Sequence, residues 1–149
     1  SIRFPSKTLD CGYFGFKRLR DSILNHVPHK KLHEVYDDVQ NNSFIFDADE
    51  KKKFYEDVNK KINDMEYLAN EGSSKEEKIF LNLFCNFFWA SDCEAKMKPA
   101  HAKAIWHYIE NATEDFSFGY SARPDCATFQ QFKQCIKECV DNNKGFYWF

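Results

Sequence analysis

The stretch FLNLFCNFFWASDCE, residues 80–94, places four phenylalanines, one tryptophan and two cysteines within fifteen positions. A transmembrane helix needs about twenty apolar residues, whereas the apolar run here covers only residues 79–90 and contains two asparagines. The stretch therefore predicts a buried helix over about residues 74–91, around which the other helices pack. Its apolar positions recur at helical spacing and form one wide stripe: Ile79, Phe80, Leu81, Leu83, Phe84, Phe87, Phe88 and Trp89.

Helix-start and helix-stop residues divide the rest of the chain. Ser73 or Ser74, each followed three residues later by Glu, can form a capping box before the central helix. Gly72 is suited to end the preceding helix, and Pro99 to begin a later one. We therefore predict an all-α fold with five or six helices in a single compact domain, residues 1–149, held by disulfides. These signals delimit segments 14–28, 29–39, 47–72, 74–91, 99–112 and 126–140.

The charge balance excludes several classes of partner. Twenty-one Lys and Arg face 23 Asp and Glu, which gives a formal net charge of −2. The short basic clusters at 29–33 and 51–53 are each followed closely by acidic residues. Binding to nucleic acid or to anionic lipid would require a basic patch. We therefore expect no nucleic-acid partner and no membrane span, and the charge pattern does not predict an oligomeric state.

The six cysteines and two sequons predict a secreted glycoprotein. An even number of cysteines is typical of disulfide frameworks in extracellular proteins. Asn41 and Asn111 each begin an N-x-Ser/Thr sequon, the acceptor for N-glycosylation. The chain begins at Ser1 without Met, as expected after removal of a signal peptide. The cysteines that we expect to be oxidised in three bridges, whose pairing stays open, are Cys11, Cys85, Cys93, Cys126, Cys135 and Cys139.

No motif predicts a reaction or a cofactor. Cys135 and Cys139 lie one helical turn apart, but the chain has no CxxC pair, and its histidines are scattered, whereas zinc sites usually show tighter paired ligand spacing. His29 and His33 have i, i+4 spacing, but charged neighbours indicate a solvated helix face. The segment FSFGYSA lacks the second glycine of a nucleophile elbow. We therefore predict no metal, no cofactor and no catalysis, with a small secreted hydrolase as the third alternative.

Aromatic clusters suggest two binding functions, each of which competes with ordinary core packing. The first function is recognition of an extracellular protein, since aromatic side chains dominate protein interfaces. The second is transport of a small apolar ligand in a cavity. The contact patch predicted for the first consists of Phe116, Phe118, Tyr120, Phe146, Tyr147, Trp148 and Phe149. The cavity wall predicted for the second consists of Phe84, Phe87, Phe88 and Trp106.

The last residues, GFYWF, allow two arrangements. Four consecutive aromatic side chains cannot all face one way in any regular structure. In the first arrangement two or three rings fold back and plug a groove beside the central helix, with Gly145 providing the turn. In the second the rings stay exposed as an apolar patch, which soluble monomers seldom tolerate without a partner. The risk of aggregation favours the plug.

Overall fold

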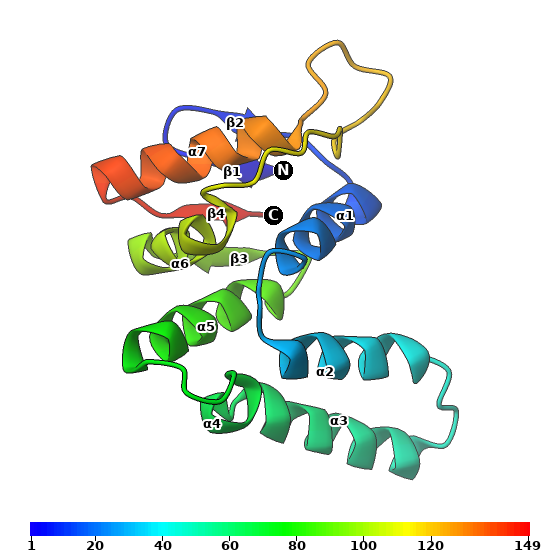
Figure 1. The fold of residues 1–149 in the computed structure, drawn as a ribbon. Coiled ribbons are helices and arrows are strands. Elements are labelled where there is room, and N and C mark those ends of the chain that lie inside the picture. The colour runs from blue at the N-terminus through cyan, green and yellow to red at the C-terminus, as the bar shows by residue number, and fades with distance from the viewer. The chain divides into compact units, whose positions relative to one another are not determined.

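The computed structural model describes all residues 1–149 and contains seven helices and four short strands (Figure 1). The helices cover 55% of the residues, and the strands form one antiparallel sheet. The prediction of an all-α fold is therefore wrong. Each strand has only two or three residues. Such strands are too short to show the alternation of apolar and polar residues that reveals a strand in a sequence.

The chain divides into two compact units. Unit 1 comprises Ser1–Val27 and Leu83–Phe149, and unit 2 comprises Pro28–Asn82. None of the helices is long and apolar enough to cross a lipid bilayer. The elements along the chain are β1 Ile2–Arg3, β2 Thr8–Leu9, α1 Tyr13–Leu24, α2 Lys30–Asn41, α3 Ala48–Ile62, α4 Met65–Leu68, α5 Lys75–Phe88, β3 Ala95–Met97, α6 Pro99–Ile109, α7 Phe129–Asn142 and β4 Phe146–Trp148.

The sheet of unit 1 has the strand order β2-β1-β4-β3, so the first and last strands of the chain pair at its centre. Ile2 of β1 lies opposite both Leu9 and Trp148, and Trp148 also lies opposite Ala95. Successive side chains of a strand point to opposite faces. Ile2, Leu9 and Trp148 are buried, whereas Tyr147 in the next row is exposed. The sheet therefore has one buried and one exposed face.

Aromatic rings fill the core of unit 1. Phe87 of α5 is fully buried. Its ring centre lies 5.9 Å from that of Trp148, 6.2 Å from that of Phe146 and 6.5 Å from that of Phe16. These three contacts are edge-to-face, a geometry that aromatic pairs prefer. The stretch 80–94 thus supplies the ring that links α1 and β4 in this core.

Capping residues fix the starts of α6 and α7 in unit 1. Pro99 is the first residue of α6, as predicted. Thr128 precedes α7, and its hydroxyl accepts the backbone N–H of Gln131 at 3.3 Å. The side chain of Gln131 accepts the N–H of Thr128 at 3.0 Å, which completes a capping box. Because of this box, α7 begins at Phe129 and not at residue 126 as predicted.

Side-chain caps divide unit 2 into short helices. Asp47 begins α3 by accepting a backbone N–H three residues later, at 2.9 Å. Asp64 does the same for α4. The segment 47–72, predicted as one helix, therefore forms two. Ser74 Oγ accepts the N–H of Glu77 at 3.1 Å before α5, which selects one of the two predicted capping positions.

His29 is buried in unit 2, so the prediction of an exposed helix face is wrong at this residue. Its side chain is only 2% exposed. Nδ1 accepts the backbone N–H of Asn70 at 3.0 Å, and Nε2 lies 3.4 Å from a carboxylate oxygen of Glu77. The imidazole thus connects the start of α2 to the segment between α4 and α5. The charged neighbours that suggested exposure belong to the other faces of α2.

The prediction of a disulfide-stapled protein is wrong. All six cysteines are free, and no two of them lie within disulfide distance. Cys11, Cys85, Cys135 and Cys139 are buried, Cys126 is half-buried and Cys93 is exposed. Buried thiols act as small apolar side chains in a core. An even count of cysteines indicated bridges, but a count carries no information about the distances that a bridge requires.

Candidate functional site

Every strongly exposed aromatic side chain of unit 1 lies along one surface, which we call the aromatic strip. The strip is unusual because single exposed apolar residues are normally scattered over a protein surface. It runs from the exposed face of the sheet to the start of α1. Its members and their exposed fractions are Tyr147 44%, Phe149 59%, Tyr13 58%, Phe14 82% and Tyr120 49%.

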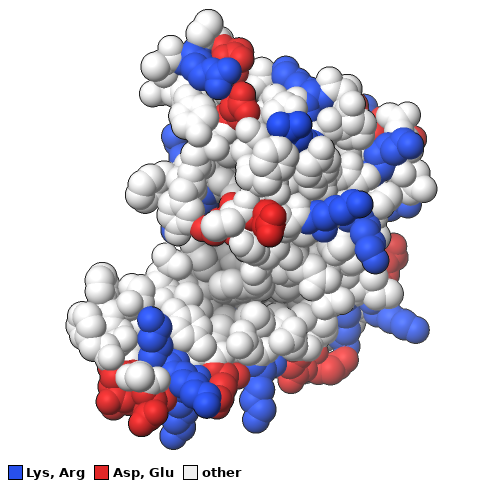
Figure 2. Space-filling model, turned by 180° about the vertical axis from the view of Figure 1, so that it is seen from behind, with Lys and Arg blue, Asp and Glu red and all other residues white.

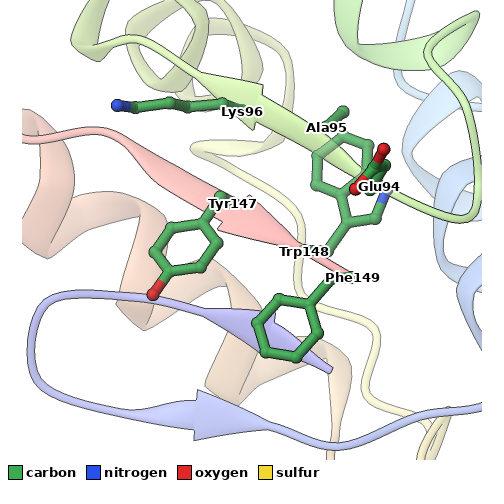
Figure 3. Close-up of a pocket in the computed structure, with 6 residues that line it drawn as sticks. All are labelled: Glu94, Ala95, Lys96, Tyr147, Trp148 and Phe149. Carbon is green, nitrogen blue, oxygen red and sulfur yellow. The ribbon is translucent and has the colours of Figure 1, made fainter.

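The sheet provides one end of the strip. Phe146 and Trp148 of β4 point into the core, so Tyr147 and the following Phe149 point to the exposed face. The rings of Tyr147 and Phe149 stack with their centres 6.1 Å apart, and Figure 3 shows both on the same face of β4. The guanidinium of Arg3 lies 4.4 Å from the centre of the Phe149 ring. Strand alternation thus holds two rings in place at the surface.

The start of α1 provides the other end. Tyr13 and Phe14 occupy its first turn, with ring centres 5.4 Å apart. Tyr120 reaches this turn from the loop before α7, with a ring carbon 3.6 Å from the Cβ position of Gly12. Gly15 allows the approach, because a Cβ there would lie 1.8 Å from the carbonyl oxygen of Phe118.

Two hollows lie between the ends of the strip. The smaller, about 280 Å³, is lined by Tyr13, Trp148 and Phe149 together with residues of β1 and the segment before β3. The larger, about 580 Å³, lies over β3 and β4. Both are lined by Trp148 and Phe149, so the two hollows adjoin at the end of β4. The residues that line the larger hollow, drawn in Figure 3, are Glu94, Ala95, Lys96, Tyr147, Trp148 and Phe149.

Charged side chains border the strip at both ends. At the sheet, Arg3 and Lys96 lie directly opposite Tyr147 on the two neighbouring strands. Near the start of α1, Asp10 accepts a hydrogen bond from the Ser1 hydroxyl at 2.6 Å and pairs with Arg123 at 3.2 Å. The hydroxyl bond, followed by the charge of Arg123, lowers the pKa of Asp10. Asp10 is therefore a carboxylate at neutral pH, and the border of the strip is ionic.

Two thiols line the smaller hollow. Cys11 is buried, and burial raises the pKa of its thiol, which disfavours the nucleophilic thiolate. Cys93 is exposed, and its Sγ lies 3.6 Å from a carboxylate oxygen of Asp92. Neither hollow is lined by a histidine that could act as a general base. No group of three His, Cys, Asp or Glu side chains is arranged to hold a metal ion.

The predicted contact patch is only partly at the surface. Tyr120 and Tyr147 belong to the strip, and so does Phe149. Phe118, Phe146 and Trp148 are buried, and Phe116 is half-buried beneath the guanidinium of Arg18, 4.8 Å from its ring centre. The tail therefore combines both predicted arrangements, since alternate rings plug the core and face solvent.

The predicted cavity wall lies in packed protein. Phe84, Phe87 and Phe88 are almost completely buried and contact one another or other aromatic rings. Trp106 is half-buried, and the ammonium of Lys133 lies 5.7 Å from its ring centre. None of these four residues lines either hollow of the strip.

Sequence reasoning missed Tyr13 and Phe14. The first predicted helix begins at Phe14, and its apolar stripe, which starts at Phe16, identifies only the buried side of the helix. Two aromatic residues at the polar side of an amphipathic helix were the signal that could have identified them. The two sequon asparagines, Asn41 and Asn111, are both exposed.

Comparisons with known proteins give no relatives for this chain. No model of a known protein family, no curated protein and no solved structure matches it.

Proposed function

We propose that the protein is a non-catalytic binding protein that contacts another protein through the aromatic strip. The observation that carries the proposal is the gathering of all five exposed aromatic side chains of unit 1 along one surface. Tyrosine is among the residues that contribute most to protein interfaces, and aromatic rings as a class are enriched there. The Tyr147–Phe149 stack is held by β4, so little side-chain entropy is lost on binding.

A protein partner fits the strip better than a small apolar ligand. Carrier sites enclose most of the surface of their ligand. The two hollows are open to solvent and not enclosed, and the strip extends beyond both to Phe14 and Tyr120. A contact surface of this kind, with an apolar centre and an ionic border, is typical of protein interfaces.

We also propose an extracellular location. Because the cysteines form no disulfides, this location rests on the sequons at Asn41 and Asn111, whose side chains are exposed. The mass change after treatment of the natural protein with a peptide N-glycosidase would test it. Loss of one or two glycans supports the proposal, and an unchanged mass removes its remaining basis.

Affinity capture with matched variants tests the binding proposal. Wild-type protein, a Phe14→Ser/Phe149→Ser variant and an Ile79→Ser control would be immobilised and exposed to extract from the source. Ile79 is 51% exposed and lies in unit 2, so its replacement also removes an exposed apolar side chain. All three proteins should show the same circular dichroism and melting temperature.

The expected result is one partner captured in equal amount by the wild type and the control. Calorimetry with that purified partner should show an affinity about 30-fold or more lower for the strip variant, since loss of a central interface residue costs about 2 kcal/mol or more. Equal affinity for the wild type and the strip variant would contradict the proposal.

A further inference from the structure

Unit 2 presents two exposed phenylalanines on the loop between α2 and α3. Phe44 is 75% exposed and Phe46 is 94% exposed, the most exposed large apolar side chain in the protein. We call residues 37–50, which comprise this loop, the end of α2 and the start of α3, the tip. Two rings on a short loop that are almost fully solvated contribute little to folding, because burial is the source of hydrophobic stabilisation. Their exposure needs another explanation.

The tip is strongly acidic. The segment 37–50 contains five carboxylates and no Lys or Arg, and all five carboxylates are exposed. None of them forms a salt bridge. The next basic residues, 51–53, follow on α3. Figure 2 shows this end of unit 2 at the lower left, where uncharged atoms project beside acidic side chains, with basic side chains next to them. The carboxylates are Asp37, Asp38, Asp47, Asp49 and Glu50.

The sheet end of the aromatic strip has the complementary chemistry. Tyr147 lies between Arg3 and Lys96 on the neighbouring strands. Lys98 follows β3, and Lys144 precedes β4. All four cations are exposed, and none forms a salt bridge. The hollow of about 580 Å³ beside them has an aromatic wall. This surface offers an apolar site for a ring and cations for carboxylates.

We propose that the tip of one copy of the chain docks on the sheet end of the strip of a second copy. Phe46 contacts Tyr147 and Phe149, and the carboxylates of the tip face Arg3 and Lys96. The proposal rests on the proposed function in one respect, that the strip binds protein. It names a second copy of this chain as one ligand of the strip.

Charge complementarity favours a second copy as the occupant. The exposed cations of one surface and the exposed carboxylates of the other form no salt bridge within the chain, and pairing them across an interface would steer association and exclude other partners. The five carboxylates of the tip argue against membrane insertion, because charged groups are costly to place in lipid. Each copy carries one tip and one sheet face, so copies can associate reciprocally or in a chain.

Sedimentation of the purified protein tests the proposal. Mass should increase with concentration between about 5 and 500 µM, a range that detects weak association. The increase should shrink as the salt concentration rises from about 50 to 500 mM, because exposed charges are screened. Phe46→Ser should weaken self-association at least tenfold, whereas Ile79→Ser should leave it unchanged.

Charge reversal gives a sharper test. A face variant carries Arg3→Glu and Lys96→Glu, and a tip variant carries four reversed carboxylates. Neither variant should associate with itself. An equimolar mixture of the two should associate again, because each then offers a surface that matches the other. The four substitutions of the tip variant are Asp37→Lys, Asp38→Lys, Asp49→Lys and Glu50→Lys.

Three outcomes would overturn the proposal. Wild-type protein that stays monomeric at every concentration in low salt would exclude it, as would self-association that Phe46→Ser does not weaken. Flotation with vesicles of neutral phosphatidylcholine, lost in Phe46→Ser without any self-association, would assign the tip to membranes instead. If the protein is monomeric but binding of the captured partner still depends on Phe149, this inference alone would be overturned and the proposed function would stay intact.

Discussion

Units 1 and 2 bury different kinds of side chain. Unit 1 holds all six cysteines and all three tryptophans, and its core is a network of aromatic rings. Unit 2 is helical and has a small, mostly aliphatic set of buried residues, namely His29, Leu32, Val35, Val58, Leu68 and Leu81. Unit 1 is assembled from the two ends of the chain, whereas unit 2 is continuous in sequence. The unit with the aromatic core is thus also the unit in which the two ends of the chain pair with each other.

The two units also expose aromatic rings for different reasons. In unit 1, strand alternation sends Tyr147 outwards whenever Phe146 and Trp148 point inwards. In unit 2, Phe44 and Phe46 lie on a loop where nothing covers them. The exposure of Tyr147 is thus a consequence of its buried neighbours, and the exposure of Phe44 and Phe46 is independent of the core. Four predictions test whether the two units depend on different sets of buried side chains.

The largest effect is expected from truncation after Lys144, which removes β4 from between β1 and β3 and deletes buried Phe146 and Trp148. Unit 1 should lose cooperative folding. Amide hydrogen exchange should become fast throughout residues 1–27 and 83–149. A truncated protein that keeps slow exchange in α6 and α7 would show that the sheet is not part of the unit 1 core.

Core substitutions should weaken each unit separately. Phe87→Ala should cost about 3–5 kcal/mol and Leu32→Ala about 2–5 kcal/mol, the usual range for emptying buried sites. Both side chains are fully buried. Urea denaturation would give the free energies of unfolding. Hydrogen exchange should accelerate mainly in unit 1 for Phe87→Ala and mainly in unit 2 for Leu32→Ala, and equal acceleration everywhere would mean a single cooperative core.

Alkaline pH should destabilise unit 1 selectively, because its buried thiols resist ionisation. Burial raises the pKa of Cys85 to about 12 and that of Cys135 and Cys139 to about 11, from an ordinary value of 9.0. Above pH 9 the unfolded chain loses thiol protons that the folded chain keeps, so stability falls as pH rises towards 11–12.

Denaturation curves collected from pH 8 to 11 would measure this loss. Cys85→Ala should flatten the decline, whereas the other ionising groups affect both proteins equally. Alkylation at pH 8 should modify exposed Cys93 first and leave the buried thiols protected until denaturation. Rapid native-state alkylation of Cys85 would contradict the burial on which the prediction depends.

The smallest effect is expected at His29 of unit 2. His29→Leu removes the acceptor for the part-buried backbone N–H of Asn70, and the loss of such a hydrogen bond costs about 1 kcal/mol. Urea denaturation would measure the change, with His107→Leu at an exposed position of unit 1 as the control. A loss equal to that of the control would show that the imidazole is not a structural acceptor.

Local signals allowed several elements to be predicted. Ser74 and Pro99 marked helix starts correctly because a cap depends on residues within one turn of the helix. The split at Asp64 was missed because the apolar stripe of α3 continues through Met65 and Leu68, and periodicity alone does not reveal a competing cap. Three of the five residues of the strip, Tyr120, Tyr147 and Phe149, belonged to the predicted contact patch, because aromatic residues are suited to interfaces.

By itself the sequence determined that this protein is largely helical, that residues 80–94 are rich in core-forming rings and that its charges are balanced. These properties depend on composition and on neighbours within a few residues. Only the tertiary structure decided that β1 pairs with β4, that the cysteines are too far apart to bond, and that alternate rings of the tail are buried. Each of these depends on a distance between residues remote in the chain, which no local pattern encodes.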